Sequence, residues 1–442
     1  MRIGIDGYNL AMPAGTGVAT YGLTLARTLA AGGHATCGVF GLDVGDEPAA
    51  REVAFFDQVG RGEPTDKTQQ LQRRERRALQ RRALNPWAAA AAVDVPLTGR
   101  VEVAAFADRL PRFDRVVSSP RLYDLAHRHF GLHGRFVTVS MADPPDVMHW
   151  TYPVPVTLAG ARNIYTLHDL VPMRLPYTTL DAKALYARLV ARCAARGSHV
   201  CTVSEASRRD ITELLGIKPD KVTNCHQASP TPAAVLAETD EASAEAVRGV
   251  FGLAPQGYFL FFGAIEPKKN IGRLIEAYLG LGTDTPLVIV GARAWQSEGE
   301  LHLLSQAETL RERSGRGHVV RLDYLPRALL LKLVRSARAV AFPSLYEGFG
   351  LPVLEAMQLG TPVLTSDTSS MPEIAGDAAV IVDPYDVGSI ADGLRMLDGD
   401  AALRDRLARA GPARAERFSQ AKYLARLEAM YRRVVDGSAE AA

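Results

Sequence analysis

Two glutamates at the ends of a glycine-bearing stretch are the residues whose types and spacing suggest chemistry most directly. Glu347 and Glu355 lie eight positions apart in the run Glu-Gly-Phe-Gly-Leu-Pro-Val-Leu-Glu. Apolar runs precede and follow this stretch, and each is typical of a buried strand. Pro352 favours the first turn of a helix and Gly360 favours its end. The pattern therefore predicts a strand, a glycine loop, a short helix and a second strand.

Such a unit suggests the binding of a diphosphate that carries sugars. The loop would lie at the carboxyl edge of a parallel sheet, where α/β proteins bind ligands. The helix start near Pro352 offers free backbone N–H groups and a positive dipole end, which suit a phosphate. A carboxylate at each end of the loop can hold sugar hydroxyls on both sides of the diphosphate.

A second unit of the same kind lies upstream. Residues 258–263 read as a strand, and a loop with Lys268 and Lys269 follows it. Asn270 is expected to cap the next helix, 271–281. Two lysines beside a helix start at the carboxyl edge of a sheet suit a diphosphate. The alternative is a solvated turn with two surface lysines.

The N-terminal half carries further candidates. After the strand Arg2–Asp6 comes a loop with Gly15 and Gly17, whose glycines would let the backbone approach a ligand closely. The loop does not fit G-x-G-x-x-G, so we expect no dinucleotide site; a plain turn is the alternative. His168 follows the predicted strand 163–167 on the functional edge, although a histidine there is often structural.

The loops at 263–270 and 343–357 resemble the signatures of the retaining GT-B glycosyltransferases of family four. Within that family they are most similar to the bacterial mannosyltransferases of polysaccharide and O-antigen assembly. The resemblance covers roughly residues 1–35 and 145–435, but not the segment from about 40 to 145. Further motifs match in the family's order, at 166–172, 202–210, 361–366 and 371–379.

The resemblance implies an α/β protein with the GT-B fold, in which two Rossmann-like domains face a cleft. It implies transfer of a hexose, mannose as the first guess, from a nucleotide diphosphate sugar to a saccharide or lipid-linked saccharide, with retention at the anomeric carbon. GDP-mannose is the first guess for the donor, and neither a cofactor nor a catalytic metal is expected. The family often has arginine followed by lysine where this chain has two lysines, so a bidentate contact is lost while the charge survives.

The same resemblance implies a role for each candidate residue. The lysine pair would neutralise the leaving diphosphate, assisted by N–H groups at the start of the second helix. Glu347 would hold donor sugar hydroxyls near the reacting carbon, and Glu355 would bind the ribose. His168 would lie beside the donor sugar, and the glycines of the first loop would lie near the donor phosphates. The predicted catalytic residues are therefore His168, Lys269 and Glu347. The predicted donor-binding residues are Gly15, Gly17, Lys268, Gly350, Leu351 and Glu355.

Length and composition agree with two domains. The chain has 442 residues, of which 47% are hydrophobic and 23% charged, which is typical of an ordered globular protein. We predict an N-terminal domain over 1–230, a linker over 231–256, a nucleotide-sugar-binding domain over 257–417, and a helix and tail over 418–442 that cross back to the first domain. The net charge of +2 gives no reason to expect nucleic acid.

A basic segment at 67–84 stands apart from the other motifs. Its arginine clusters and few leucines could lie on an anionic membrane surface, or they could form a solvated helix face. The four cysteines show no C-x-x-C spacing, which favours a reducing compartment. No run of eighteen apolar residues is present. We therefore expect a cytoplasmic protein, with peripheral contact at the inner face of the membrane as an open hypothesis.

Four other functions remain as alternatives. A GT-B epimerase acting on a nucleotide sugar and a non-catalytic nucleotide-sugar-binding protein would share the fold. A sugar-phosphate synthase of the sucrose type would need a basic acceptor site that the sequence does not reveal. A dehydrogenase is disfavoured because the first strand lacks the dinucleotide fingerprint.

Overall fold

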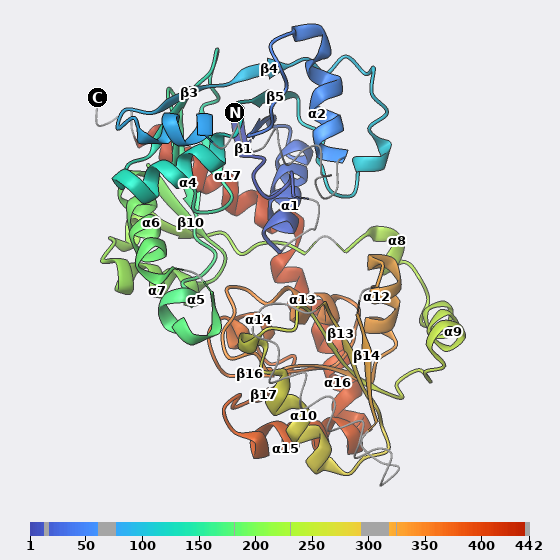
Figure 1. Cartoon of the computed structure of the whole chain (residues 1–442). Coiled ribbons are helices and arrows are strands. Elements are labelled where there is room, and N and C mark those ends of the chain that lie inside the picture. Colours follow the sequence, from blue (N-terminus) through green and yellow to red (C-terminus); the bar gives the residue numbers. More distant parts are fainter. Residues whose placement is uncertain are drawn as a thin grey trace.

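The computed structural model describes residues 1–12, 17–60, 77–180, 182–229, 231–292, 318–323 and 325–437. The chain forms two α/β halves, and each is built on its own sheet (Figure 1). The predicted glycine Gly15 and residues 67–76 of the basic segment lie outside these residues.

The N-terminal half is built on a sheet with eight strands among the described residues. Apart from the antiparallel pair at one edge, β4 with β5, the strands are parallel. The parallel pairing brings the carboxyl ends of the strands to one edge. In spatial order the strands are β11 (Val222–Asn224), β10 (His199–Thr202), β9 (Arg162–Thr166), β7 (Val147–Trp150), β1 (Arg2–Asp6), β2 (Ala35–Phe40), β5 (Arg115–Ser118) and β4 (Val93–Val95).

The C-terminal half is built on a parallel sheet with six strands among the described residues. Its central strands are buried along their whole length, because helices cover a parallel sheet on both faces. The strand order reverses between two neighbours, β12 and β15, so their loops diverge at a topological switch point. The strands are β14 (Val319–Leu322), β13 (Leu287–Val290), β12 (Phe259–Phe262), β15 (Ala339–Phe342), β16 (Val363–Ser366) and β17 (Val380–Val382).

Helices alternate with these strands, as the sequence predicts. A small parallel sheet of β3 (Ala89–Ala91), β6 (Val137–Ser140) and β8 (Val156–Leu158) accompanies the first half. The helices of the first half are α1 (Gly17–Ala31), α2 (Arg51–Gly60), α4 (Leu122–His133), α5 (Val171–Arg174), α6 (Lys183–Arg196) and α7 (Glu205–Leu215). Those of the second half include α10 (Ile271–Leu281), α12 (Arg327–Arg335), α13 (Leu351–Gln358), α14 (Met371–Ala375), α15 (Val387–Gly399) and α16 (Ala401–Ala415).

The predicted linker, 231–256, contains two helices, α8 (Ala233–Leu236) and α9 (Asp240–Phe251). Both helices contact α12 of the second half. Capping explains where α9 begins, because the Thr239 hydroxyl accepts a hydrogen bond from the N–H of Ala242.

The last helix, α17 (Gln420–Asp436), returns to the first half, as predicted. Figure 1 shows this red helix beside α1, with which it is in contact. The Tyr431 hydroxyl lies 2.6 Å from Nδ1 of His149 in β7, in the interior of the first half. The apolar residues that the sequence places on one face of the helix are all buried, namely Tyr423, Leu427, Met430, Tyr431 and Val434.

The described part of the basic segment is helical over 77–84. Leu79 is buried in the first half's core, whereas Leu84 is exposed. One predicted apolar anchor therefore holds the helix to its own domain and does not face outward. Among the described residues, none of the helices combines the length and apolarity that a membrane crossing requires. The four cysteines are free and buried.

Candidate active site

The lysine pair and Glu347 meet at the switch point of the second sheet. The lysines lie in η5 (Pro267–Lys269), which follows β12, and Glu347 follows β15. Lys269 Nζ donates a hydrogen bond of 2.5 Å to Oε1 of Glu347. The N–H of Leu345 donates to the Lys268 carbonyl at 2.8 Å, so the two loops are also joined through the backbone. The structure thus brings together two loops that are about eighty residues apart in sequence.

A further carboxylate, Glu266, completes this cluster. Its Oε1 lies 3.6 Å from Nζ of Lys268 and 4.0 Å from Nζ of Lys269. All four side chains are largely buried, and that of Glu347 is 9% exposed. Glu266 directly precedes the Pro-Lys-Lys turn, but its spacing in the sequence does not predict a role for it. The proximity of two buried cations and two carboxylates makes the cluster nearly neutral by itself.

Neighbouring charges keep Lys268 and Glu347 ionised. Burial alone would lower the pKa of Lys268, but Glu347, Asp169 and Glu266 outweigh burial and hold that pKa above its ordinary value. Burial alone would raise the pKa of Glu347, but the two lysines outweigh it and hold that pKa low. Lys269 also lies over the ring of Phe342, 4.9 Å from its centroid. Lys268 and Glu347 therefore both remain charged at neutral pH.

Glycines let the Glu347 loop approach the first half. A Cβ at Gly348 would lie 2.8 Å from the carbonyl oxygen of His168, so a larger residue would push the loop away. Gly350 has φ +108°, and a Cβ there would lie 2.3 Å from Cε of Met371. Gly350 is also the N-cap residue of α13, which begins at Leu351. The N–H groups of this first turn have no acceptor within the helix and can bind an anion.

His168 faces the same loop from the first half. It follows β9, and its Nε2 lies 2.8 Å from the carbonyl oxygen of Thr151. A carbonyl can only accept, so Nε2 carries the proton. Burial lowers the pKa of the imidazole, so the ring is neutral at neutral pH and Nδ1 is an acceptor. The ring of Tyr21 packs edge-on against it at 4.6 Å between centroids, which fixes its plane.

Glu355 lies in α13 and is held by a residue that the sequence analysis missed. Arg327 of α12 donates to both carboxylate oxygens, at 2.6 and 3.0 Å. The Ser229 hydroxyl lies 3.4 Å from Oε1. A carboxylate has about four lone-pair sites, so it can still accept hydrogen bonds from a ligand. The predicted contact of Glu355 with a ribose stays a prediction.

Asn270 differs from its predicted role. It occupies the N-cap position of α10, but its side chain does not cap the helix. The side-chain amide instead donates to the carbonyls of Pro343, at 3.0 Å, and Pro384, at 2.7 Å. The expectation of a cap was wrong because a buried amide here binds two distant loops together, and local sequence cannot reveal those loops.

Of the two predicted glycines in the first loop, Gly17 is the first residue of α1, and a Cβ there would have no atom within 4 Å.

Several hydrogen bonds among the described residues join the two halves around this site. The Ser207 hydroxyl lies 3.3 Å from the carbonyl oxygen of Gly348, and Tyr346 donates to Asp210. The carboxylate of Glu373, in α14, accepts hydrogen bonds from the backbone N–H groups of Glu205 and Ala206 at the start of α7, at 2.8 to 3.2 Å. The motif at 371–379 was recognised in the sequence, but no role was assigned to its glutamate.

Comparisons with known proteins agree with this geometry. Residues 246–414 match the family described as glycosyl transferases group 1, and residues 95–226 match glycosyltransferase family 4. The O-antigen chain mannosyltransferase B of Escherichia coli is 33% identical over 263 residues, which cover 58% of this chain and 67% of that protein. The serotype-specific mannosyltransferase WbdA of the same species is 27% identical over 67% of this chain, but only 38% of its own length is matched.

Solved structures share the fold at low sequence identity. WaaG, a glycosyltransferase involved in lipopolysaccharide biosynthesis, matches with a TM-score of 0.58 and 17% identity, over 98% of this chain and 99% of that one. Anabaena HepE in complex with UDP and glucose matches with a TM-score of 0.61 and 15% identity, over 97% of this chain and 99% of the other. The two-domain architecture is therefore that of these enzymes.

Proposed function

Because the chain belongs to the group 1 and family 4 glycosyltransferases of the GT-B fold, we propose that it transfers a hexose from a nucleotide diphosphate sugar to a saccharide hydroxyl, with retention at the anomeric carbon. One observation carries the proposal. Lys269 is hydrogen-bonded to Glu347 at the switch point of the second sheet, and the loop that holds Glu347 packs closely against the backbone of His168 in the first half. Mannose is the proposed sugar, and GDP-mannose the donor, because the similar curated proteins are mannosyltransferases.

The lysines would stabilise the leaving diphosphate. Negative charge builds up on the diphosphate oxygens as the bond to the sugar breaks, and two ammonium groups already held in position need no reorganisation to meet it. The N–H groups at the start of α13 would supply further donors. The protein's own cations would thus do what a divalent ion does in other enzymes, so we propose a reaction that requires no metal.

The carboxylates and the histidine would position the sugar nucleotide. Glu347 would accept hydrogen bonds from hydroxyls of the donor sugar, and Glu355 from the ribose. His168 would accept one from a sugar hydroxyl through Nδ1, since Nε2 is used by Thr151. Each of these groups acts by fixing the reacting carbon relative to the acceptor hydroxyl, which lowers the entropic part of the barrier.

A panel of nucleotide sugars tests the proposal. The full chain is incubated with GDP-mannose, UDP-glucose and ADP-glucose, with α-linked mannosides as acceptors, and released nucleotide and product are measured. We expect GDP-mannose to give turnover and protection against heat, and proton NMR to show an α-linked product. Glu347→Gln should reduce turnover while GDP still binds, because its carboxylate would contact the sugar. A chain that neither binds nor turns over any donor would contradict the proposal.

A further inference from the structure

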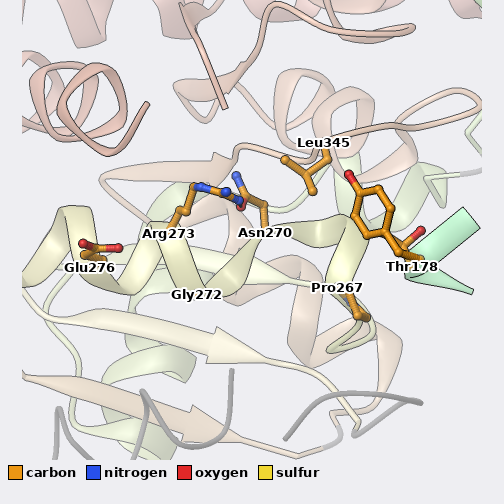
Figure 2. A pocket seen from close by; sticks show the side chains of 8 residues that line it. Thr178, Pro267, Asn270, Gly272, Arg273, Glu276 and Leu345 are labelled. Carbon is orange, nitrogen blue, oxygen red and sulfur yellow. The ribbon is translucent and has the colours of Figure 1, made fainter. Parts of the chain in front are cut away.

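We propose that a cavity between the two halves, beside the lysine turn, binds the acceptor saccharide at a sugar unit next to the reacting one. This inference rests on the proposed function. The cavity has a volume of about 400 Å³, which is within the usual range for ligand pockets. Figure 2 shows Thr178 of the first half on one side and the start of α10 on the other. Its lining includes Tyr177, Pro267, Arg273, Glu276 and Leu345.

The cavity shares its wall with the active site. Pro267 lines it, and the next two residues are the lysines of the proposed diphosphate site. Leu345 also lines it and lies two positions before Glu347. A ligand in the cavity therefore lies across one turn of backbone from the reacting groups. That separation suits a neighbouring unit of the acceptor better than a part of the donor, which would bind on the lysine side of the turn.

The chemistry of the lining suits a neutral polyhydroxylated ligand. Tyr177 lines the cavity and is 65% exposed. Tyr385, which is 50% exposed, lies near Tyr177, and burial together with this neighbour raises the pKa of Tyr385. The guanidinium carbon of Arg273 lies 5.8 Å from the centroid of the Tyr385 ring. Exposed aromatic faces with a polar edge pack against the C–H faces of sugars, while guanidinium and carboxylate groups bind hydroxyls.

The charges of the lining argue against an anionic ligand. Arg273 donates to the side-chain oxygen of Asn270 at 2.9 Å and is one turn of helix from the exposed carboxylate of Glu276 (Figure 2). One cation and one anion leave the lining without net charge, so its charged groups do not select for a phosphate. Because Tyr177 and Arg273 come from different halves, a saccharide bound between them would also favour the arrangement in which the halves are in contact.

The test compares variants of the cavity with a matched surface variant. Tyr177→Ala and Glu276→Gln change the lining, whereas Leu180→Ala removes an equally exposed side chain three positions away that does not line the cavity. Transfer is measured with mannose and with the three α-linked mannobioses (1→2, 1→3 and 1→6) as acceptors. Binding of the same mannobioses to the full chain is measured by saturation-transfer NMR.

We expect Tyr177→Ala to raise KM for the best mannobiose on the order of tenfold, with a much smaller effect on KM for mannose. Glu276→Gln should act in the same direction, and Leu180→Ala should behave as the parent. Cavity variants that match Leu180→Ala in both measurements would overturn the inference, as would a parent that binds none of the mannobioses. Calorimetry with GDP reports separately on the donor site: a parent that binds no donor and turns none over refutes the proposed function, not the cavity alone.

Discussion

Replacing Glu373 should loosen the contact between the two halves of the molecule. Its carboxylate accepts hydrogen bonds from the first N–H groups of α7 and lies 2.5 Å from Nε2 of His226. A carboxylate from one domain thus occupies the positive end of a helix in the other. In Glu373→Ala the N–H groups of Glu205 and Ala206 lose this partner, and water must replace it.

The size of the effect follows from these contacts. Water can reach the helix end in an open form, so each of the two backbone contacts contributes about 1 kcal/mol net. The charge at the helix end adds about 0.5–1 kcal/mol. The sum, about 2.5–3 kcal/mol, corresponds to a shift of the closed-to-open equilibrium by roughly 70- to 160-fold. Glu373→Gln keeps an acceptor but loses the charge, so it should cost about 1 kcal/mol.

Solution scattering and transfer kinetics measure this directly. We expect Glu373→Ala to show a larger radius of gyration than the parent, and a reduced kcat/KM because the His168 and Glu347 loops separate. Addition of GDP and acceptor should partly restore the compact form. Glu245→Ala, an exposed glutamate of α9, is the matched control. If Glu373→Ala has the same radius of gyration and the same kcat/KM as Glu245→Ala, the hydrogen bonds between Glu373 and α7 do not hold the two halves together.

The pH dependence of this contact has a definite sign. Burial would raise the pKa of Glu373, but the hydrogen bonds from His226 and from the N–H of Glu205 outweigh it and hold the pKa below its ordinary value of 4.5. The contribution of Glu373 is therefore fully present above about pH 4.5 and is lost as the pH falls through the lowered pKa. Between pH 6 and 8 the carboxylate should not change the compactness of the protein.

Four further outcomes are expected. Lys269→Ala should reduce turnover on the order of a hundredfold or more and weaken GDP binding in calorimetry, because the leaving group loses its nearest cation; unchanged values would remove it from the site. Glu355→Ala should weaken binding of free GDP, and equal affinity would exclude the ribose contact. Activity should survive excess EDTA, whereas a loss that Mg²⁺ or Mn²⁺ reverses would contradict the metal-independent mechanism. Anionic vesicles should bind the parent less as salt rises, and less still after glutamine replaces the exposed arginines, each worth about 1 kcal/mol; a parent that stays in the supernatant at low salt would refute membrane contact. Those arginines are Arg77, Arg81 and Arg82.

The two strand–loop–helix units were predictable because local signals agree there. Helix α10 has the predicted bounds, 271–281, and the apolar run before the glycine stretch forms strand β15, as predicted. Apolar runs of four or five residues, a proline in the first turn and glycines with positive φ mark these elements within a short stretch of sequence. Since parallel strands align their carboxyl ends, the order of the units alone brings the lysines and Glu347 to one edge of the sheet.

The missed contacts were those between distant side chains. Arg327 lies in an ordinary amphipathic helix, and only the tertiary fold of the second half brings it to Glu355. Glu373 reaches α7 only because the two halves face each other. Asn270 is a related case. Its residue type and position predict a helix cap, but its side chain joins two distant loops that the local sequence does not reveal. Patterns of spacing report on the chain's own helices and strands, whereas such pairings depend on which surfaces later meet.

The balance of charge at the lysine turn suggests how donor binding and catalysis are coupled. In the structure Lys269 is bound by Glu347, and Glu266 lies within 4.0 Å of both lysines. Removing one member of a buried pair typically costs about 3–5 kcal/mol, so lysines without such partners would destabilise the protein before any donor arrived. We propose that an arriving diphosphate would replace Glu347 as the partner of Lys269. The carboxylate would then be free to accept hydrogen bonds from the sugar, and only while the diphosphate is in place. The double variant Lys269→Ala with Glu347→Gln should therefore unfold at a higher temperature than Lys269→Ala alone, while remaining inactive; a double variant that is no more stable than the single one would show that the pair is not what stabilises this turn.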